Sequence, residues 1–205
     1  MKRIAFFVEG QTEQIFVTHL LTEVLGKNNL SIISKHIVGG TNVPKRELIK
    51  KISIPRQARY MALIYDCGSD NRVKSVILEN LQSLKDSGYE AIVGLRDLYP
   101  LPLEELPQLK KGLDFLPREL RKYTHTPYKI LVAVREVETW FLAETHHYSR
   151  VNYRLTGPFI KRRLNFSPFE IDATTRAHPA EDLNNIYRLV GKSYTKKRWQ
   201  VEKLM

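Results

Sequence analysis

Short apolar runs that each end at an acidic residue constrain this 205-residue chain more than any other feature. The first run, RIAFFV at residues 3–8, ends at Glu9-Gly10 and is too short for a helix, so it predicts a buried strand. Three further runs share this pattern, and a fifth strand-like run ends in glycines instead. The acid-ended runs are YMALIYD (60–66), YEAIVGLRD (89–97) and YKILVAVRE (128–136), and the glycine-ended run is SIISKHIV (31–38).

Helical patterns separate these predicted strands. After the first strand, Ile15, Phe16, Leu20 and Val24 recur with helical spacing, and Gly26 follows, which predicts a helix that ends there. Proline in the first turn favours a helix over 44–52, sequence PKRELIKKI. The remaining helices are predicted over 71–87, from 137, and from Pro179.

Strands that alternate with helices predict an α/β fold with a mainly parallel sheet and helices on both faces. Residues 1–147 are expected to form this domain, with a proline-rich irregular insertion at 99–127. Residues 148–205 are expected to form a basic helical C-terminal extension. Residues 151–205 contain eleven Lys or Arg against five Asp or Glu, which is six of the eleven net positive charges of the chain.

Composition and local motifs exclude several classes of protein. The chain lacks a signal-peptide pattern and an apolar run of membrane-spanning length, and Cys67 is its only cysteine, so a cytoplasmic protein without a membrane partner is expected. A net charge of +11 favours a polyanionic partner, with nucleic acid the leading class. The absence of GxxxxGK, GxGxxG and GxSxG motifs argues against an NTPase, a dinucleotide enzyme and an α/β hydrolase.

The acids at the strand ends are the candidate site. In an open parallel sheet the ligand site lies beyond the carboxyl ends of the strands, so these carboxylates are expected to converge. A cluster of carboxylates repels itself unless a cation neutralises it, and Mg²⁺ or Mn²⁺ suits oxygen ligands. The predicted catalytic residues are Glu9, Glu13, Asp97 and Glu138, and the predicted metal ligands are Glu9, Asp66, Asp97 and Glu138. The alternative for each acid is a structural role, as a helix cap or an acceptor of backbone N–H bonds.

Basic residues provide candidate contacts to phosphates, and Trp199 offers a surface on which a base could stack. The predicted set is Arg135, Lys161, Arg162, Arg163, Lys196, Lys197, Arg198 and Trp199. The alternative is a solvated basic face. The remaining motifs favour structural roles: His146-His147 at the surface or as caps, Cys67 as a small buried residue, and Trp140, Phe141 and Leu142 in the core.

Several motifs carry a family resemblance. The segment VEGQTEQIFV (8–17) resembles the first motif of Toprim-type domains, especially in nucleases of the overcoming-lysogenization-defect group. The segments GLRDLYPLP (94–102), VAVREVETWFLAE (132–144) and HPAEDLNNIYRLVGKSYTK (178–196) resemble the DUF4276 family, whose members are often discussed as Toprim-like. The resemblance extends over most of the chain.

The resemblance implies a Toprim-like (Rossmannoid) sheet, Mg²⁺ at its edge and cleavage of DNA or RNA. It places Glu9 at the motif-one glutamate, as general acid/base or metal ligand. The second Toprim motif is an Asp-x-Asp pair, but Asp66-Cys67-Gly68 and Asp97-Leu98-Tyr99 each keep only the first acid, so both stay candidates, with Asp97 preferred. An SMC/ABC-like ATPase partner and antiphage defence also follow from the resemblance alone, and the sequence leaves a homo-oligomer open.

Two functions are therefore expected to compete. The first is a Mg²⁺-dependent Toprim-like nuclease that acts on phosphodiesters in phage or mobile-element defence. The second is a non-catalytic module with a degenerate Toprim-like site that binds nucleic acid or an ATPase.

Overall fold

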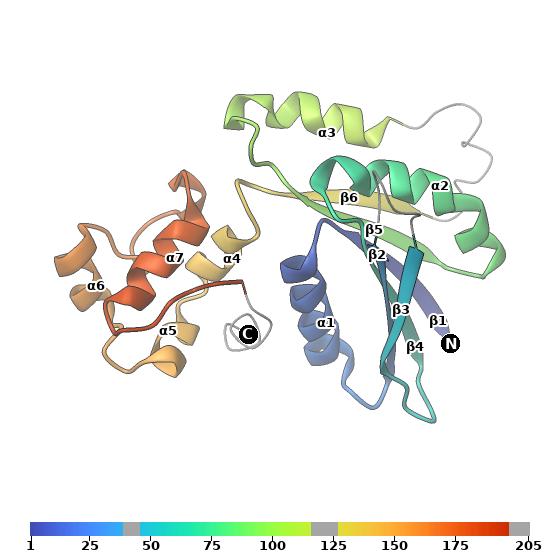
Figure 1. The fold of residues 1–205 in the computed structure, drawn as a ribbon, viewed down its shortest axis with the longest axis horizontal. Coiled ribbons are helices and arrows are strands. Elements are labelled where there is room, and N and C mark those ends of the chain that lie inside the picture. The colour runs from blue at the N-terminus through green and yellow to red at the C-terminus, as the bar shows by residue number, and fades with distance from the viewer. Residues whose placement is uncertain (39–45, 116–126, 197–205) are drawn as a thin grey trace. The chain divides into compact units, whose positions relative to one another are not determined.

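The computed structural model describes residues 1–38, 46–115 and 127–196 (Figure 1). Its strands are β1 (Lys2–Val8), β2 (Leu30–Val38), β3 (Arg46–Ser53), β4 (Tyr60–Asp66), β5 (Ala91–Asp97) and β6 (Tyr128–Ala133). Its α-helices are α1 (Gln11–Leu25), α2 (Val73–Asp86), α3 (Leu106–Asp114), α4 (Glu138–Ala143), α5 (His146–Val151), α6 (Gly157–Leu164) and α7 (Pro179–Arg188). Short 3₁₀ turns are η1 (Asp70–Arg72), η2 (Leu103–Glu105) and η4 (Ala173–Thr175).

The chain divides into two compact units. The sheet unit comprises Met1–Arg96 and Pro107–Val132, and the helical unit comprises Asp97–Leu106 and Ala133–Met205. The predicted domain boundary at residue 147 stays a prediction.

The six strands form one sheet in the order β3-β2-β4-β1-β5-β6. β1 pairs in parallel with both β4 and β5, and β2 pairs in parallel with β4, which confirms the α/β class with a mostly parallel sheet. Because the central strands are covered on both faces, their side chains are apolar on both faces, as in the almost fully buried pattern of β4.

Each face of the sheet has its own apolar core. On one face, Phe7 and Tyr65 stack at 5.3 Å between ring centroids and pack with Ile77 and Leu81 of α2. On the other face, the core contains Val8 and Ile64 of the sheet together with Val17 of α1. α2 and α3 thus cover one face and α1 the other (Figure 1).

The segment 46–53 corrects one prediction. It was expected to belong to a helix over 44–52, but it forms β3, an edge strand antiparallel to β2. The Glu47 carboxylate accepts hydrogen bonds from Tyr65 Oη at 2.8 Å and Lys35 Nζ at 3.1 Å, and these bonds keep the Glu47 pKa below its usual range. Pairing with a distant strand therefore outweighs the local helix signal, which was a proline in the first turn.

One prediction about burial is also wrong, and one apolar pattern does not mark the packed face of its helix. Leu20 and Val24 of α1 are exposed, by 46% and 70%. α1 packs on the sheet through Val17, Leu21 and Leu25 instead. Trp140 is 36% exposed, whereas Phe141 and Leu142 are buried as expected. In both helices, tertiary contacts decide which side packs, and the apolar residues of the sequence alone do not show it.

Candidate functional site at the carboxyl edge of the sheet

Asp66 and Glu9 lie at the carboxyl ends of neighbouring parallel strands. Asp66 ends β4 opposite Val8 of β1, so Glu9 follows one residue beyond this pair. His36 of β2 is opposite Asp66 on its other side. Three neighbouring strands thus bring the Asp66 carboxylate, the His36 imidazole and the turn that begins at Glu9 to the same edge of the sheet unit.

Asp66 is held on both carboxylate oxygens. Its Oδ2 lies 2.8 Å from His36 Nδ1, and its Oδ1 accepts the N–H of Gly68 at 2.9 Å. Gly68 has φ of 77°, a left-handed conformation that glycine adopts without strain and that turns the chain back over the carboxylate. Asp66 is only 4% exposed, while the His36 side chain is half-exposed, so the pair connects a buried carboxylate to the surface.

Glu13 caps the helix that follows Glu9. Its Oε2 accepts the N–H of Gly10, the N-cap of α1, at 3.0 Å. Glu13 is buried, and its charge lies in the first turn, where the helix dipole stabilises a carboxylate. The capping alternative is therefore realised for Glu13, and its predicted catalytic role stays a prediction.

Glu9 and Asp66 offer carboxylate oxygens, which are the type of ligand that a hard divalent cation prefers. Within the described ranges, no three or more His, Cys, Asp or Glu side chains are arranged to hold a metal ion. Mg²⁺, however, is commonly held by one or two carboxylates and otherwise by water and substrate phosphates. Two carboxylates at adjacent strand ends match that requirement, and His36 is placed to orient the Asp66 carboxylate.

Asp97 and Glu138 belong to the helical unit. Asp97, the last residue of β5, accepts the N–H of Val137, the N-cap of α4, at 2.9 Å. Asp97 thus stabilises the start of α4 by accepting a backbone N–H bond. This is the structural role that was predicted as the alternative to metal binding. The prediction that all four acids converge on one ion stays a prediction, since they are divided between the two units.

Glu138 is the most deeply buried of the predicted acids, with no exposed surface. Its Oε1 accepts a hydrogen bond from Tyr194 Oη at 2.9 Å and lies 3.0 Å from Lys196 Nζ. Among the described residues, Oε2 has no hydrogen-bond partner. Glu138 therefore ties α4 to residues 194–196 of the C-terminal segment.

The residues before α4 have unusual conformation or contacts. Arg135 has φ of 71°, and its Nε is buried without a hydrogen-bond partner in the part of the chain that the structure describes. The neighbouring Glu136 accepts the N–H of Ala180 in the first turn of α7 at 3.3 Å. The stretch between β6 and α4 is thus fixed to α7 through Glu136, and a phosphate contact by Arg135 stays a prediction.

The predicted nucleic-acid contacts fall into three groups. Lys161, Arg162 and Arg163 are exposed on α6, where Lys161 forms an ion pair with Glu170 at 2.7 Å. Lys196 is engaged by Glu138. Residues 197–199, the predicted Lys-Arg-Trp contacts, lie outside the described residues.

His36 was not predicted from sequence, because its strand ends in Gly39-Gly40 rather than in an acid. His36 nevertheless lies near the end of a predicted strand, and that position could have identified it as a candidate site residue. Cys67 is fully buried, as expected, and burial raises the pKa of its thiol to about 12. A thiol in that state is not a nucleophile at neutral pH.

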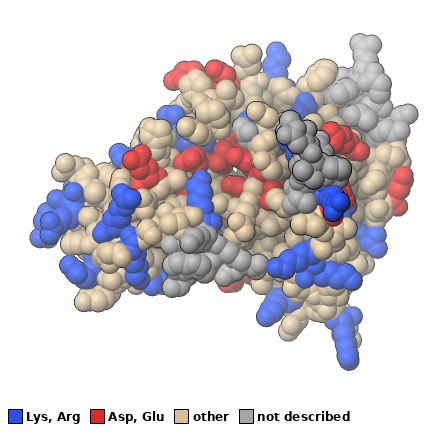
Figure 2. Space-filling model, in the orientation of Figure 1, with Lys and Arg blue, Asp and Glu red and all other residues tan. Residues whose placement is uncertain are grey.

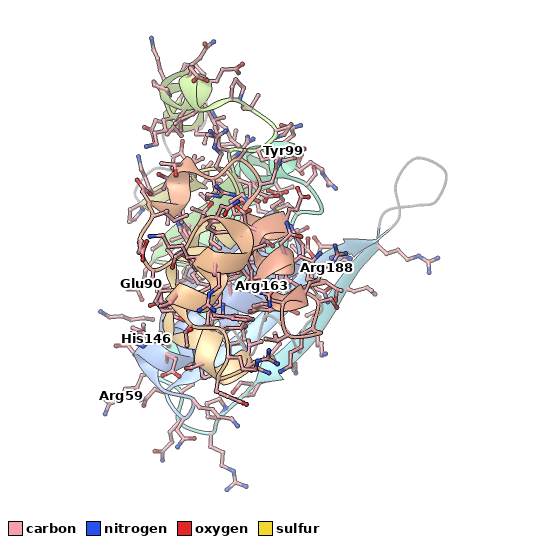
Figure 3. All side chains as sticks on the ribbon, turned by 90° about the vertical axis from the view of Figure 1, so that its left-hand side faces the viewer. Arg59, Glu90, Tyr99, His146, Arg163 and Arg188 are labelled. Atoms are coloured by element: carbon pink, nitrogen blue, oxygen red, sulfur yellow. The ribbon has the colours of Figure 1, made fainter. Side chains whose placement is uncertain are left out.

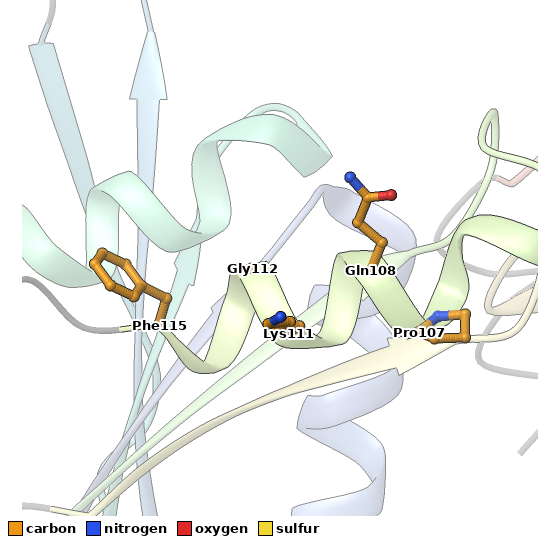
Figure 4. Close-up of a pocket in the computed structure, with 5 residues that line it drawn as sticks. All are labelled: Pro107, Gln108, Lys111, Gly112 and Phe115. Atoms are coloured by element: carbon orange, nitrogen blue, oxygen red, sulfur yellow. The ribbon is translucent and has the colours of Figure 1, made fainter.

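Two surface cavities lie in the sheet unit away from these acids. One, of about 660 Å³, is lined by Pro107, Gln108, Lys111, Gly112 and Phe115 along one side of α3 (Figure 4). The other, of about 520 Å³, is polar and lies where the α1–β2 turn meets the β3–β4 connection, lined by Asn28, Asn29, Pro55, Arg56, Gln57 and Arg59. Neither cavity contains an acid of the predicted site.

The fold and its edge define a class, an α/β protein with a six-stranded, mostly parallel sheet and acids at the carboxyl ends of its strands. The chain belongs to the family described as "Domain of unknown function (DUF4276)", whose model matches residues 8–202. No characterised protein and no solved structure showed a significant match. In the described ranges, no helix has the length and apolar composition needed to cross a membrane.

Proposed function

We propose that this chain is a Mg²⁺- or Mn²⁺-dependent, Toprim-like nuclease whose site lies at the carboxyl edge of β1 and β4. The observation that carries the proposal is the register that makes Val8 and Asp66 neighbours, so that Glu9 and Asp66 end adjacent parallel strands. This is the position at which open α/β sheets bind their ligands. The resemblance of VEGQTE (8–13) to the first Toprim motif supports the same placement.

The residues of the site divide the work. Glu9 and Asp66 would hold the cation through carboxylate oxygens. His36 orients Asp66 through the 2.8 Å contact, and Glu13 holds the turn that presents Glu9 by capping α1. A bound Mg²⁺ would supply charge stabilisation for a phosphoryl group and a more acidic water.

Cleavage assays with Glu9→Gln and Asp66→Asn test this proposal. Purified protein should cut single-stranded or duplex DNA or RNA with Mg²⁺ or Mn²⁺, and each substitution should lower the rate by about a hundredfold or more. Glu90→Gln is the matched control, since Glu90 is exposed just before β5, at the opposite, amino edge of the same sheet, where its N–H bonds to the Arg3 carbonyl. Wild-type protein that cuts no substrate with either ion would overturn the proposal.

A non-catalytic binding module is the second candidate. The observation that favours it is that both oxygens of Asp66 already accept bonds within the protein. Calorimetric titration with Mn²⁺ separates the two functions. The nuclease must take up the ion and lose that uptake in Asp66→Asn, whereas a binding module would bind oligonucleotide with no ion uptake.

An ATPase partner and a role in antiphage defence are proposed on the family resemblance alone. Co-purification of the tagged chain with an SMC/ABC-like ATPase encoded beside it would support that part of the proposal. A matched ATPase that never co-purifies, with or without ATP, would argue against it.

A further inference from the structure

The turn between α5 and α6 presents an unusually exposed aromatic side chain. Tyr153 is 82% exposed, the highest value among the large apolar and aromatic side chains of the described residues. Its neighbour Arg154 is also exposed. A single exposed aromatic residue needs no explanation, but an aromatic beside several cations has the composition of a nucleic-acid surface.

The backbone that carries Tyr153 is fixed on both sides. Val151 and Leu155 are buried and anchor the two ends of the turn. Between them, the Asn152 side chain accepts the Arg154 N–H at 2.9 Å, and the Asn152 carbonyl accepts the Leu155 N–H at 3.0 Å. Tyr153 is therefore held outward by a rigid turn, so a ligand that stacks on it would not have to order the backbone.

Arginines continue from this turn onto α6. The Arg154 guanidinium lies 5.6 Å from the centre of the Phe159 ring, which fixes its direction. Arg162 and Arg163 follow Phe159 by three and four positions, so they share its side of the helix. Neither forms an ion pair with any residue that the structure describes, in contrast to Lys161, which pairs with Glu170.

The charge around the turn is mainly positive. Residues 146–170 contain five Lys or Arg and one acid, Glu170. Figure 2 shows the blue Lys and Arg side chains gathered over α6, and Figure 3, which views that side, labels Arg163 and His146. The Tyr153 surface, defined as Tyr153, Arg154, Arg162 and Arg163, therefore combines one aromatic with three exposed guanidinium groups.

We infer that the Tyr153 surface binds single-stranded nucleic acid, with Tyr153 stacked on a base and the arginines on phosphates. A duplex hides the faces of its bases, so an outward aromatic ring contributes to binding only when the strand is single. Guanidinium groups pair with phosphate oxygens at two points, which suits a backbone that follows the helix. The inference deepens the proposed function, because it names the form of nucleic acid that the protein takes, and it rests on that function for its role in cleavage.

Fluorescence anisotropy in EDTA tests the inference without cleavage. The probes are labelled oligothymidylate, labelled oligouridylate, and the thymidylate strand annealed to its complement. Tyr153→Ala should weaken binding to the single strands by about tenfold, Tyr153→Phe should retain it, and the duplex should be affected little. Arg162→Gln and Arg163→Gln should each make the plot of log K against log salt less steep, by about 0.7 in slope.

Matched controls come from the sheet unit. Phe115→Ala removes another exposed aromatic, and Arg56→Gln removes another exposed arginine. Each should weaken single-strand binding far less than the substitutions in the Tyr153 surface do. The inference is overturned if Tyr153→Ala binds as the wild type does, if the duplex competes equally, or if only anionic lipid vesicles bind at this surface. Single-strand binding that depends on Tyr153 in a protein that never cleaves would overturn the nuclease proposal and leave this inference standing.

Discussion

At the scale of single residues, His147 shows how burial changes chemistry. It was predicted at the surface or as a cap, but its side chain has no exposed surface and lies 4.0 Å from the Tyr148 ring, centroid to centroid. Burial lowers the pKa of His147 to about 4, although Glu144 Oε2, 3.4 Å from Nδ1, opposes the shift. Neither ring nitrogen has hydrogen-bond geometry to a described residue, so this histidine is an uncharged core residue.

Acid should therefore destabilise the protein through His147. The pKa is about 6.5 unfolded and about 4 folded, so the unfolded chain binds more protons between these values, and stability falls as the pH drops from 6.5 toward 4. The loss should approach about 3 kcal/mol. Urea unfolding of wild type and His147→Phe at a series of pH values measures it. A His147→Phe protein with the same pH dependence would contradict the assignment.

Glu138 should contribute to stability through Tyr194. Tyr194→Phe removes a hydrogen bond to a buried carboxylate and should cost about 1–2 kcal/mol. Glu138→Ala should cost more, about 2–4 kcal/mol, because it also leaves a cavity and the Tyr194 hydroxyl without its acceptor. Urea midpoints measure both, and Glu181→Ala on the exposed side of α7 serves as a control. Equal midpoints for Glu138→Ala and its control would refute the structural role.

At the scale of elements, β5 depends on one glycine for its packing. A Cβ on Gly94 would lie 2.9 Å from Ile130 Cγ1 of β6 and 3.1 Å from Ile77 Cδ1 of α2. Those distances are too short for carbon atoms, so the strand can approach both neighbours only without a side chain. The close contact on this face of the sheet is thus set by a residue with no side chain.

Gly94→Ala should lower the free energy of unfolding by about 1–3 kcal/mol, because the core must shift to accept the methyl group. Gly112→Ala is the matched control, since nothing lies within 4 Å of its added Cβ and α3 should gain helix propensity. Thermal melts of both proteins give the comparison. The explanation fails if two results are found together. Gly94→Ala is as stable as the wild type, and the double variant Gly94→Ala, Ile130→Ala is less stable than both the wild type and Gly94→Ala.

At the scale of the whole molecule, the excess of eleven positive charges is the dominant property. Charges on both units contribute to the attraction of a polyanion, whichever surface makes the specific contacts. Association with any oligonucleotide should therefore weaken steeply and linearly in log K against log salt, by about 0.7 per phosphate contact for single strands. Anisotropy titrations at several salt concentrations measure the slope. A slope near zero would show that the net charge has no part in binding.

Much of the fold follows from local pattern. The strands β1, β2, β4, β5 and β6 were predicted because apolar runs of strand length lie between turn signals, and α2 and α7 because their apolar residues recur with helical spacing. Cys67 and Phe141 are buried as predicted. The acids were chosen because they follow the predicted strands. The rule that ligands bind beyond the carboxyl ends of parallel strands made them candidates for a site.

Contacts between residues far apart in the chain decided the rest. The segment 46–53 became a strand because β2 was available to pair with it, and His36 meets Asp66 only because β2 and β4 are neighbours. The exposure of Trp140 and the burial of His147 depend on which side of α4 and α5 packs. Sequence alone therefore determined the type and length of most elements, since these reflect local geometry. The tertiary structure determined which elements pair and which side chains are buried, because pairing and burial depend on contacts between residues far apart in the chain.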